Sequence, residues 1–129
     1  MRLVAILIGA MFAMSAFAQT QLDLNEDACT SYQKADAELN KTYKAILRKK
    51  SDDPVFLAAM KKAQRAWVAF RDAEIEAVYP EADKQAQYGS VYPMCNCGVA
   101  AHLTQQRVEQ LKAWLTAEEG DVCNGSKWP

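Results

Sequence analysis

EDACTSYQKADAELNKTYKAILRKK, residues 26–50, is the stretch that decides the fold of this chain. Its apolar side chains return every three or four positions, which is the period of one buried helical face. The members of this stripe are Ala28, Tyr32, Ala35, Leu39, Tyr43, Ile46 and Leu47. Asn25 or Asp23 is suited to cap the start of the helix. The segment therefore predicts one long amphipathic helix from about Glu26 to Lys50.

A second helix is expected almost immediately after the first. Ser51-Asp52-Asp53-Pro54 reads as a stop followed by a start, with Asp53 as the N-cap and Pro54 at the first helical position. Helical periodicity continues to Tyr79, and Pro80 ends it. Because the link is so short, the two helices are expected to be antiparallel neighbours.

The following segment, 80–97, contains Gly89 and Pro93 and shows no sustained period, so we predict a long ordered loop. A third helix should begin near Gly98, weaken soon after Trp114 and end by Gly120, with the tail returning along the bundle. The predicted fold is all-α: a small, antiparallel, disulfide-stapled three-helix bundle with a long loop between its second and third helices.

Residues 1–18 have the three parts of an export signal. Arg2 supplies the positive region, Leu3 to Phe17 the apolar region, and Ala16-Phe17-Ala18 the cleavage site. The apolar run is shorter than the roughly 20 residues that a membrane span needs. We therefore expect a signal peptide over 1–18 and one periplasmic or secreted helical domain over 19–129, without a membrane anchor.

Cys29, Cys95, Cys97 and Cys123 give the expected mature domain an even number of cysteines. In a small exported domain this predicts two disulfides. A bond between Cys95 and Cys97 would strain disulfide geometry. One of these two is therefore expected to pair with Cys29 and the other with Cys123, in either order.

Composition and motifs argue against several functions. With 15 basic and 16 acidic side chains, the chain lacks the positive charge typical of nucleic-acid binding. It has no G-x-S-x-G, H-E-x-x-H or glycine-rich phosphate loop, so we expect no catalytic residue, no cofactor and no enzymatic activity. Cys95-Asn96-Cys97, with Met94 and His102, offers an alternative soft-metal site, with which disulfide formation competes.

Polar residues interrupt the apolar stripes of all three predicted helices. Asp36 and Asn40 lie in the first stripe, Arg71 in the second and Arg107 in the third. Because buried charge is costly unless it is paired, we predict one buried network that fixes how the helices meet. A ligand pocket or an acid/base pair is the functional alternative. A paired aspartate and a protonated arginine are poorly suited to proton transfer. Asp72 is expected to be an exposed partner of Arg71.

Three spaced groups of residues point to a known family. The most specific is Ala63-Gln64-Arg65-Ala66-Trp67 followed by Arg71-Asp72. The other matching positions are Cys29, Asp36, Leu39, Asn40, Tyr43, Thr104, Arg107 and Leu111. Together they resemble the LprI-like lysozyme-inhibitor family. The resemblance implies a small exported helical protein that inhibits lysozyme-type muramidases. This chain departs from many relatives by lacking a cysteine near Ile75 and by adding Cys123, so their disulfide pairing is not carried over.

An inhibitor of an enzyme with a cleft must present something that protrudes. Tyr88, Tyr92 and Pro93 in the predicted loop are candidate anchors, because aromatic rings on a rigid loop lose little entropy on binding. Packing of these tyrosines into the core is the alternative. We therefore expect a binding protein for lysozyme or another cell-wall muramidase. The alternatives are an envelope adaptor or stress protein with another partner, and a metal-binding or redox protein that uses Cys95 and Cys97.

Overall fold

The computed structural model describes residues 19–127, which fold into helices with no strand among them. The elements are α1 (Gln21–Lys49), α2 (Pro54–Val78), α3 (Lys84–Tyr88), the 3-10 turn η1 (Gly89–Val91), α4 (Tyr92–Thr116) and the 3-10 segment η2 (Val122–Lys127). The all-α class is thus confirmed. The expected signal peptide lies outside the described residues. Within those residues, no helix combines the length and apolar character that a bilayer span requires.

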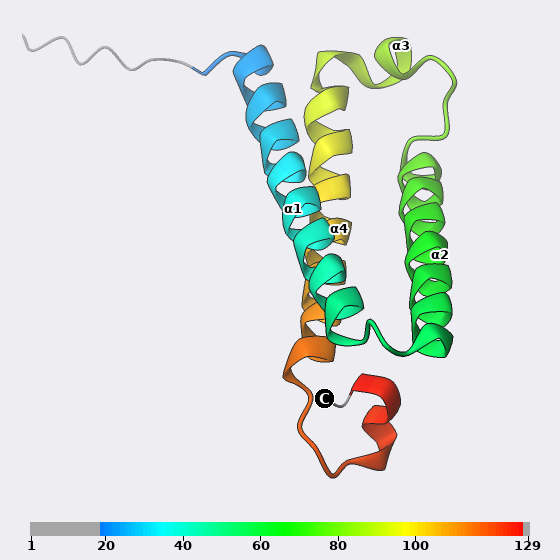
Figure 1. The fold of residues 1–129 in the computed structure, drawn as a ribbon. Coiled ribbons are helices and arrows are strands. Elements are labelled where there is room, and N and C mark those ends of the chain that lie inside the picture. The colour runs from blue at the N-terminus through cyan, green and yellow to red at the C-terminus, as the bar shows by residue number, and fades with distance from the viewer. Residues whose placement is uncertain (1–18, 128–129) are drawn as a thin grey trace, which may run out of the picture.

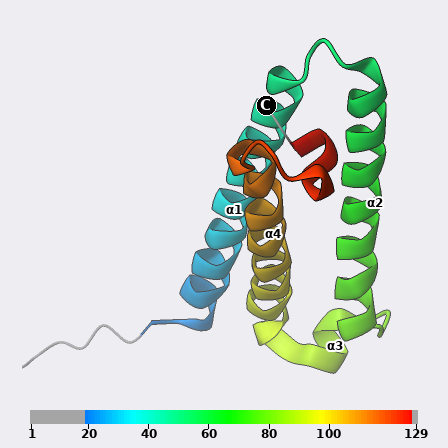
Figure 2. The ribbon, with the colours of Figure 1, turned by 90° about the horizontal axis from the view of Figure 1, so that it is seen from below.

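The helices are not equally spaced. Figure 1 shows α1 and α4 side by side along their length, while α2 stands farther from both and α3 joins it to α4 at one end. The view from below shows the same wide separation of α2 (Figure 2). Side chains rather than close backbone contact therefore connect α2 to the other helices.

Small and branched residues make the α1 and α4 contact close. From α1, Ala35, Leu39, Thr42 and Ile46 are buried, and from α4, Cys97, Ala100, Ala101, Thr104, Val108 and Leu111. Phe56 and Met60, near the start of α2, complete the main core cluster. The core therefore lies between α1 and α4. α2 contributes buried residues to it only near its N-terminal end, and Trp67 packs against it farther along the helix.

The two long helices before residue 80 largely follow the predictions. Asp53 caps α2 by accepting a hydrogen bond from the Phe56 amide at 2.9 Å, and Pro54 is the first helical residue, as expected. α1 starts earlier than Glu26, because Thr20 rather than Asn25 or Asp23 is its N-cap. Thr20 and Asp23 form a capping box, and hydrogen bonds from the Thr20 backbone and hydroxyl lower the pKa of the Asp23 carboxyl.

The prediction of a long loop up to Cys97 was wrong. Asp83 caps the short helix α3, and Gly89 ends it with a positive φ of 70°, a conformation that favours glycine. α4 then begins at Tyr92, with Pro93 in its first turn. Pro93 marks a helix start here rather than a loop, because the first turn does not need its missing amide hydrogen.

Asn25 explains how α4 begins without a cap of its own. Its side-chain oxygen accepts a hydrogen bond from the Met94 amide at 3.2 Å, and its amide nitrogen donates to the Ser90 carbonyl at 3.1 Å. A residue of α1 thus caps α4 across the helix pair. Periodicity within one segment does not reveal such a cap.

One disulfide forms, between Cys29 of α1 and Cys97 of α4, with a Cα–Cα distance of 4.9 Å. The predicted second disulfide is wrong, since Cys95 and Cys123 are free. α4 ends at Thr116, soon after Trp114 as expected, but the tail turns back only as far as the first turns of α2, where Ser126 lines a cavity with Phe56. Lys127 lies over the Trp114 ring, 5.4 Å from its centre. A helix rising 1.5 Å per residue places this end roughly 30 Å from Cys95.

Candidate functional site

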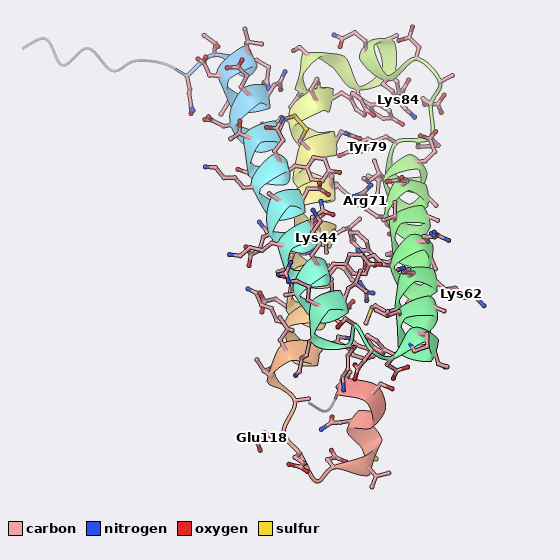
Figure 3. All side chains as sticks on the ribbon, viewed as in Figure 1. Lys44, Lys62, Arg71, Tyr79, Lys84 and Glu118 are labelled. Carbon is pink, nitrogen blue, oxygen red and sulfur yellow. A yellow bond between two sulfur atoms is a disulfide. The ribbon has the colours of Figure 1, made fainter. Side chains whose placement is uncertain are left out.

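Arg71, in the C-terminal third of α2, connects that helix to the middle of α1 (Figure 3). Its side chain is only 13% exposed, and its guanidinium lies 5.5 Å from the Trp67 ring centre and 5.8 Å from that of Tyr32. The guanidinium pairs with Asp72 at 2.8 Å and approaches Asp36 at 3.8 Å. Arg71 therefore combines cation–π contacts to two aromatic rings with ion pairs to two carboxylates.

The acidic side of this cluster is not buried, contrary to the prediction. The Asp36 side chain is 42% exposed, and Asn40 is exposed as well. The Asn40 side chain donates to the Asp36 carboxylate at 3.1 Å and to the Asp36 carbonyl at 2.9 Å, one turn away on the same helix. Because α2 stands away from α1, solvent reaches these groups.

Arg107 does not join the Arg71 cluster, so the single predicted network is wrong. It donates hydrogen bonds to Gln64 of α2 and to Gln110 of α4, each at 3.1 Å. Within residues 19–127 it forms no ion pair with a carboxylate, and its burial lowers the pKa of its guanidinium. Two separate clusters therefore hold α2, one toward α1 through Arg71 and one toward α4 through Arg107.

The remaining motif residues lie in the packing. Leu39 belongs to the main core cluster, and Tyr43 packs against that cluster. Thr104 is fully buried between α1 and α4, with no hydrogen-bond partner for its hydroxyl oxygen. The motif of the sequence thus describes mainly how the three long helices meet.

The end of the molecule at α3 holds a cluster of three tyrosines. Tyr79 packs edge-on against Tyr88 and Tyr92, with ring centres 5.2 and 5.3 Å apart, and Tyr88 stacks on Tyr92 at 5.9 Å. Burial, followed by the nearby Cys95 thiol, raises the pKa of Tyr79. All three tyrosines and Pro93 are half-buried. The rings therefore contact one another and join α2, α3 and α4.

Lys84 ties the turn before α4 to the end of α2 (Figure 3). Its ammonium group donates to the two carboxylate oxygens of Glu76, at 3.0 and 3.1 Å, and to the Tyr79 carbonyl. The Tyr88 hydroxyl accepts a hydrogen bond from the Glu81 amide at 3.4 Å. Segment 80–91 is thus a cross-tied turn whose exposed side chains include Gln85 and Gln87.

Sequence reasoning named Asn25 only as a cap of the first helix and missed its contacts with α4, and it missed Tyr79 and Lys84 as site residues. Tyr79 immediately before Pro80 was a usable signal, because two more tyrosines follow and aromatic residues group when buried together. The roles of Asn25 and Lys84 depend on contacts across the fold, so local spacing gives no sign of them.

The described residues suggest no metal site. Among residues 19–127, no three histidine, cysteine or acidic side chains lie close enough to share a metal ion. Cys97 is also oxidised with Cys29, so Cys95 and Cys97 do not form a dithiol. The clusters that exist bind helices to one another.

The fold and these contacts define a class: small, disulfide-stapled helical proteins in which ionic and aromatic contacts join one helix to a helix pair. The chain belongs to the LprI lysozyme inhibitor family, whose sequence profile matches residues 13–111. A protein of Rhizobium meliloti (strain 1021) described as uncharacterized is 39% identical over 113 residues, which covers 79% of this chain and 78% of that protein. No solved structure matches the chain.

Proposed function

We propose that this protein is an exported inhibitor of lysozyme-type muramidases. The observation that carries the proposal is the match of residues 13–111 to the lysozyme inhibitor family. A family of inhibitors fits a chain in which the clustered side chains of residues 19–127 join helices to one another. The proposed target is lysozyme or another cell-wall muramidase.

Two features support export. Residues 1–18 have the charge, apolar run and cleavage site of a signal peptide. The Cys29–Cys97 disulfide belongs to an oxidising compartment such as the periplasm or the cell exterior. N-terminal sequencing of the protein recovered from the periplasm or medium should begin at Gln19. A start at Met1 would contradict cleavage.

The turn between α2 and α4 is the surface we propose for binding. It lies at one end of the molecule, where α3 joins α2 to α4 (Figure 1), and the Lys84 contacts and the tyrosine cluster hold it in place. A preformed turn loses little entropy when it enters a cleft. Tyr88 and Tyr92 act here as support, and the exposed amides of Gln85 and Gln87 face the partner.

Chemistry supports the choice of amides. A muramidase cleft binds a polysaccharide by hydrogen bonds and places two carboxyl groups beside the bond to be cleaved. Glutamine side chains both donate and accept hydrogen bonds, so they suit sugar-binding positions. We expect Gln85 and Gln87 to occupy such positions and to block substrate entry.

The direct test is inhibition of cell-wall lysis. Purified exported protein, with its disulfide verified by mass, should slow lysis by lysozyme at near-stoichiometric ratios. The assay should include several classes of lysozyme. Absence of inhibition for every class would reject the proposed function.

A paired substitution tests the surface separately. Gln85→Glu with Gln87→Glu places new carboxylates against the acidic cleft and should weaken inhibition at least about tenfold. The control is Gln105→Glu with Gln106→Glu, which adds the same charge to exposed positions of α4 far from the turn. Equal inhibition by both variants would reject the turn as the binding surface while leaving inhibition itself established.

A further inference from the structure

α2 carries an exposed apolar face, and at its N-terminal end Ala59 and Ala63 border a cavity that Trp114 and Ser126 also line. Its inner face holds Phe56, Met60 and Arg71, which contact the core and α1. On another side of the helix, apolar residues recur at alternating steps of four and three, and all of them are exposed: Ala59, Ala63, Ala66, Phe70, Ala73 and Ala77. Phe70 is 52% exposed, which is unusual for a large aromatic ring without a partner. Lys62, at the edge of this face, points away from α1 and α4 (Figure 3).

Steps of four and three are the spacing with which one helix packs against another in a coiled coil. Alanine side chains also let two helices approach closely, near the lower limit of about 8 Å between axes. The face therefore fits a helix better than it fits an irregular surface. The charges beside it indicate which helix.

We propose that this face binds the same face of a second copy, with the two α2 helices antiparallel about a two-fold axis. One register accounts for the whole stripe. It places Ala66 opposite Phe70 of the second copy, Ala63 opposite its Ala73 and Ala59 opposite its Ala77. In each layer of Ala66 and Phe70, the small alanine leaves room for the phenylalanine ring. Ala69 lies beside the two-fold axis, where a small side chain is required.

Charge complementarity selects this partner and this direction. Apart from Arg71, which faces α1, the basic residues of α2 come first, at Lys61, Lys62 and Arg65, and the acidic residues Asp72, Glu74 and Glu76 follow. In the antiparallel register, Lys62 of each copy lies beside Glu76 of the other, at the flanking positions that choose orientation in coiled coils. A parallel pair would instead place the basic first half of each helix level with the basic first half of the other. The Glu76 side chain is 65% exposed while it binds Lys84, so its oxygens can accept further hydrogen bonds.

Sedimentation velocity tests this assembly on the protein expressed from its full sequence, from about 1 μM to about 1 mM, a range that includes the affinity of a small interface. Every sample carries Cys123→Ser, so that the exposed thiol does not link two chains. We expect a reversible monomer–dimer equilibrium. A monomer throughout this range would overturn the proposal.

Four variants locate the interface. Ala66→Glu should abolish the dimer, because it places a charge in the apolar seam while leaving an exposed helical position filled by a good helix former. Lys62→Glu should raise the dissociation constant about tenfold, because two symmetric attractions become repulsions. Lys62→Glu combined with Glu76→Lys should restore most of that loss. Lys61→Glu, the same charge change away from the seam, is the control and should have little effect.

Circular dichroism of each variant verifies that the helices are intact. A dimer that survives Ala66→Glu would overturn the proposal, since the contact would then use another surface. Equal effects of Lys62→Glu and Lys61→Glu would also overturn it, because net charge rather than the predicted pair would be responsible. Inhibition of lysozyme does not enter these measurements, so their outcome is independent of the proposed function.

Discussion

The α1–α4 pair and α2 are held by different kinds of contact. α1 and α4 bury small and aliphatic side chains along their length, and the Cys29–Cys97 disulfide joins them near one end. α2 buries only Phe56 and Met60 among its residues and otherwise reaches the pair through long side chains such as Arg71. The pair forms the scaffold, and α2 with the turn after it presents surface.

This difference teaches where single changes are costly. At the buried positions of the pair, a substitution removes close contacts that water cannot replace. Along most of α2, water can solvate a charged side chain that has lost its ion-pair partner, so the loss of stability is small. The predictions below compare the two regions, beginning with the largest expected effect.

Removal of the disulfide should be the most damaging change to the pair. Cys29→Ser with Cys97→Ser opens a link between residues separated by 68 positions. Chain entropy then predicts a loss of about 4 kcal/mol in the free energy of unfolding, measured by urea denaturation. Cys123→Ser is the control, because this exposed thiol is free and its loss should cost less than about 0.5 kcal/mol. Equal losses for the two changes would contradict the pairing.

A cavity in the pair should rank second. Leu111 has no exposed surface and packs within the main core cluster. Leu111→Ala should lower the free energy of unfolding by about 3 kcal/mol, because it removes buried methyl groups and leaves a void. Leu22→Ala, at a side chain that is 68% exposed on α1, is the matched control with little expected effect. A loss for Leu111→Ala below about 1 kcal/mol would mean that the pair is loosely packed.

On α2, Arg71→Ala should cost about 2 kcal/mol, through the loss of two ring contacts and of the ion pair with Asp72. Arg71→Lys should recover only part of this, since an ammonium group lacks the planar surface that stacks on Tyr32 and Trp67. Thermal and urea denaturation measure both variants. Full recovery by lysine would show that charge alone holds α2 to α1.

The smallest effect is expected at Asp36. If Asp36 were one partner of a buried ion pair, its removal would lower the free energy of unfolding by several kcal/mol. The structure shows a half-exposed carboxylate, 3.8 Å from a guanidinium that Asp72 already binds at 2.8 Å. Asp36→Ala should therefore lower the free energy of unfolding by less than about 1 kcal/mol. A loss of 3 kcal/mol or more, roughly the effect of breaking a buried pair, would restore the buried network.

The sequence was sufficient for features that depend on one segment. Periodicity and the Asp53-Pro54 start signal predict α2 almost to the residue, because its cap and its first turn are local. The family motif identifies the residues at the helix contacts for the same reason, since each part of the motif lies on one helix face. The expected inhibitor class follows from that motif.

Features that depend on contacts between segments could not be predicted from the sequence. The start of α4 relies on Asn25 of α1, and the pairing of Cys29 depends on the direction in which α4 leaves the turn. The burial of Asp36 depends on the distance between α2 and α1. The spacing of residues in the sequence does not determine that distance. The exposure of Phe70 has the same origin, because periodicity shows an apolar position but not what covers it.

Native-state hydrogen exchange tests most directly whether α1–α4 is the scaffold and α2 the more weakly held helix. Amides of α2 after Trp67 should exchange through an opening with a lower free energy than those of α1 around Leu39 and of α4 around Thr104. The difference should be largest without denaturant and shrink as urea drives global unfolding. Equal exchange free energies for all three helices at every urea concentration would contradict this account.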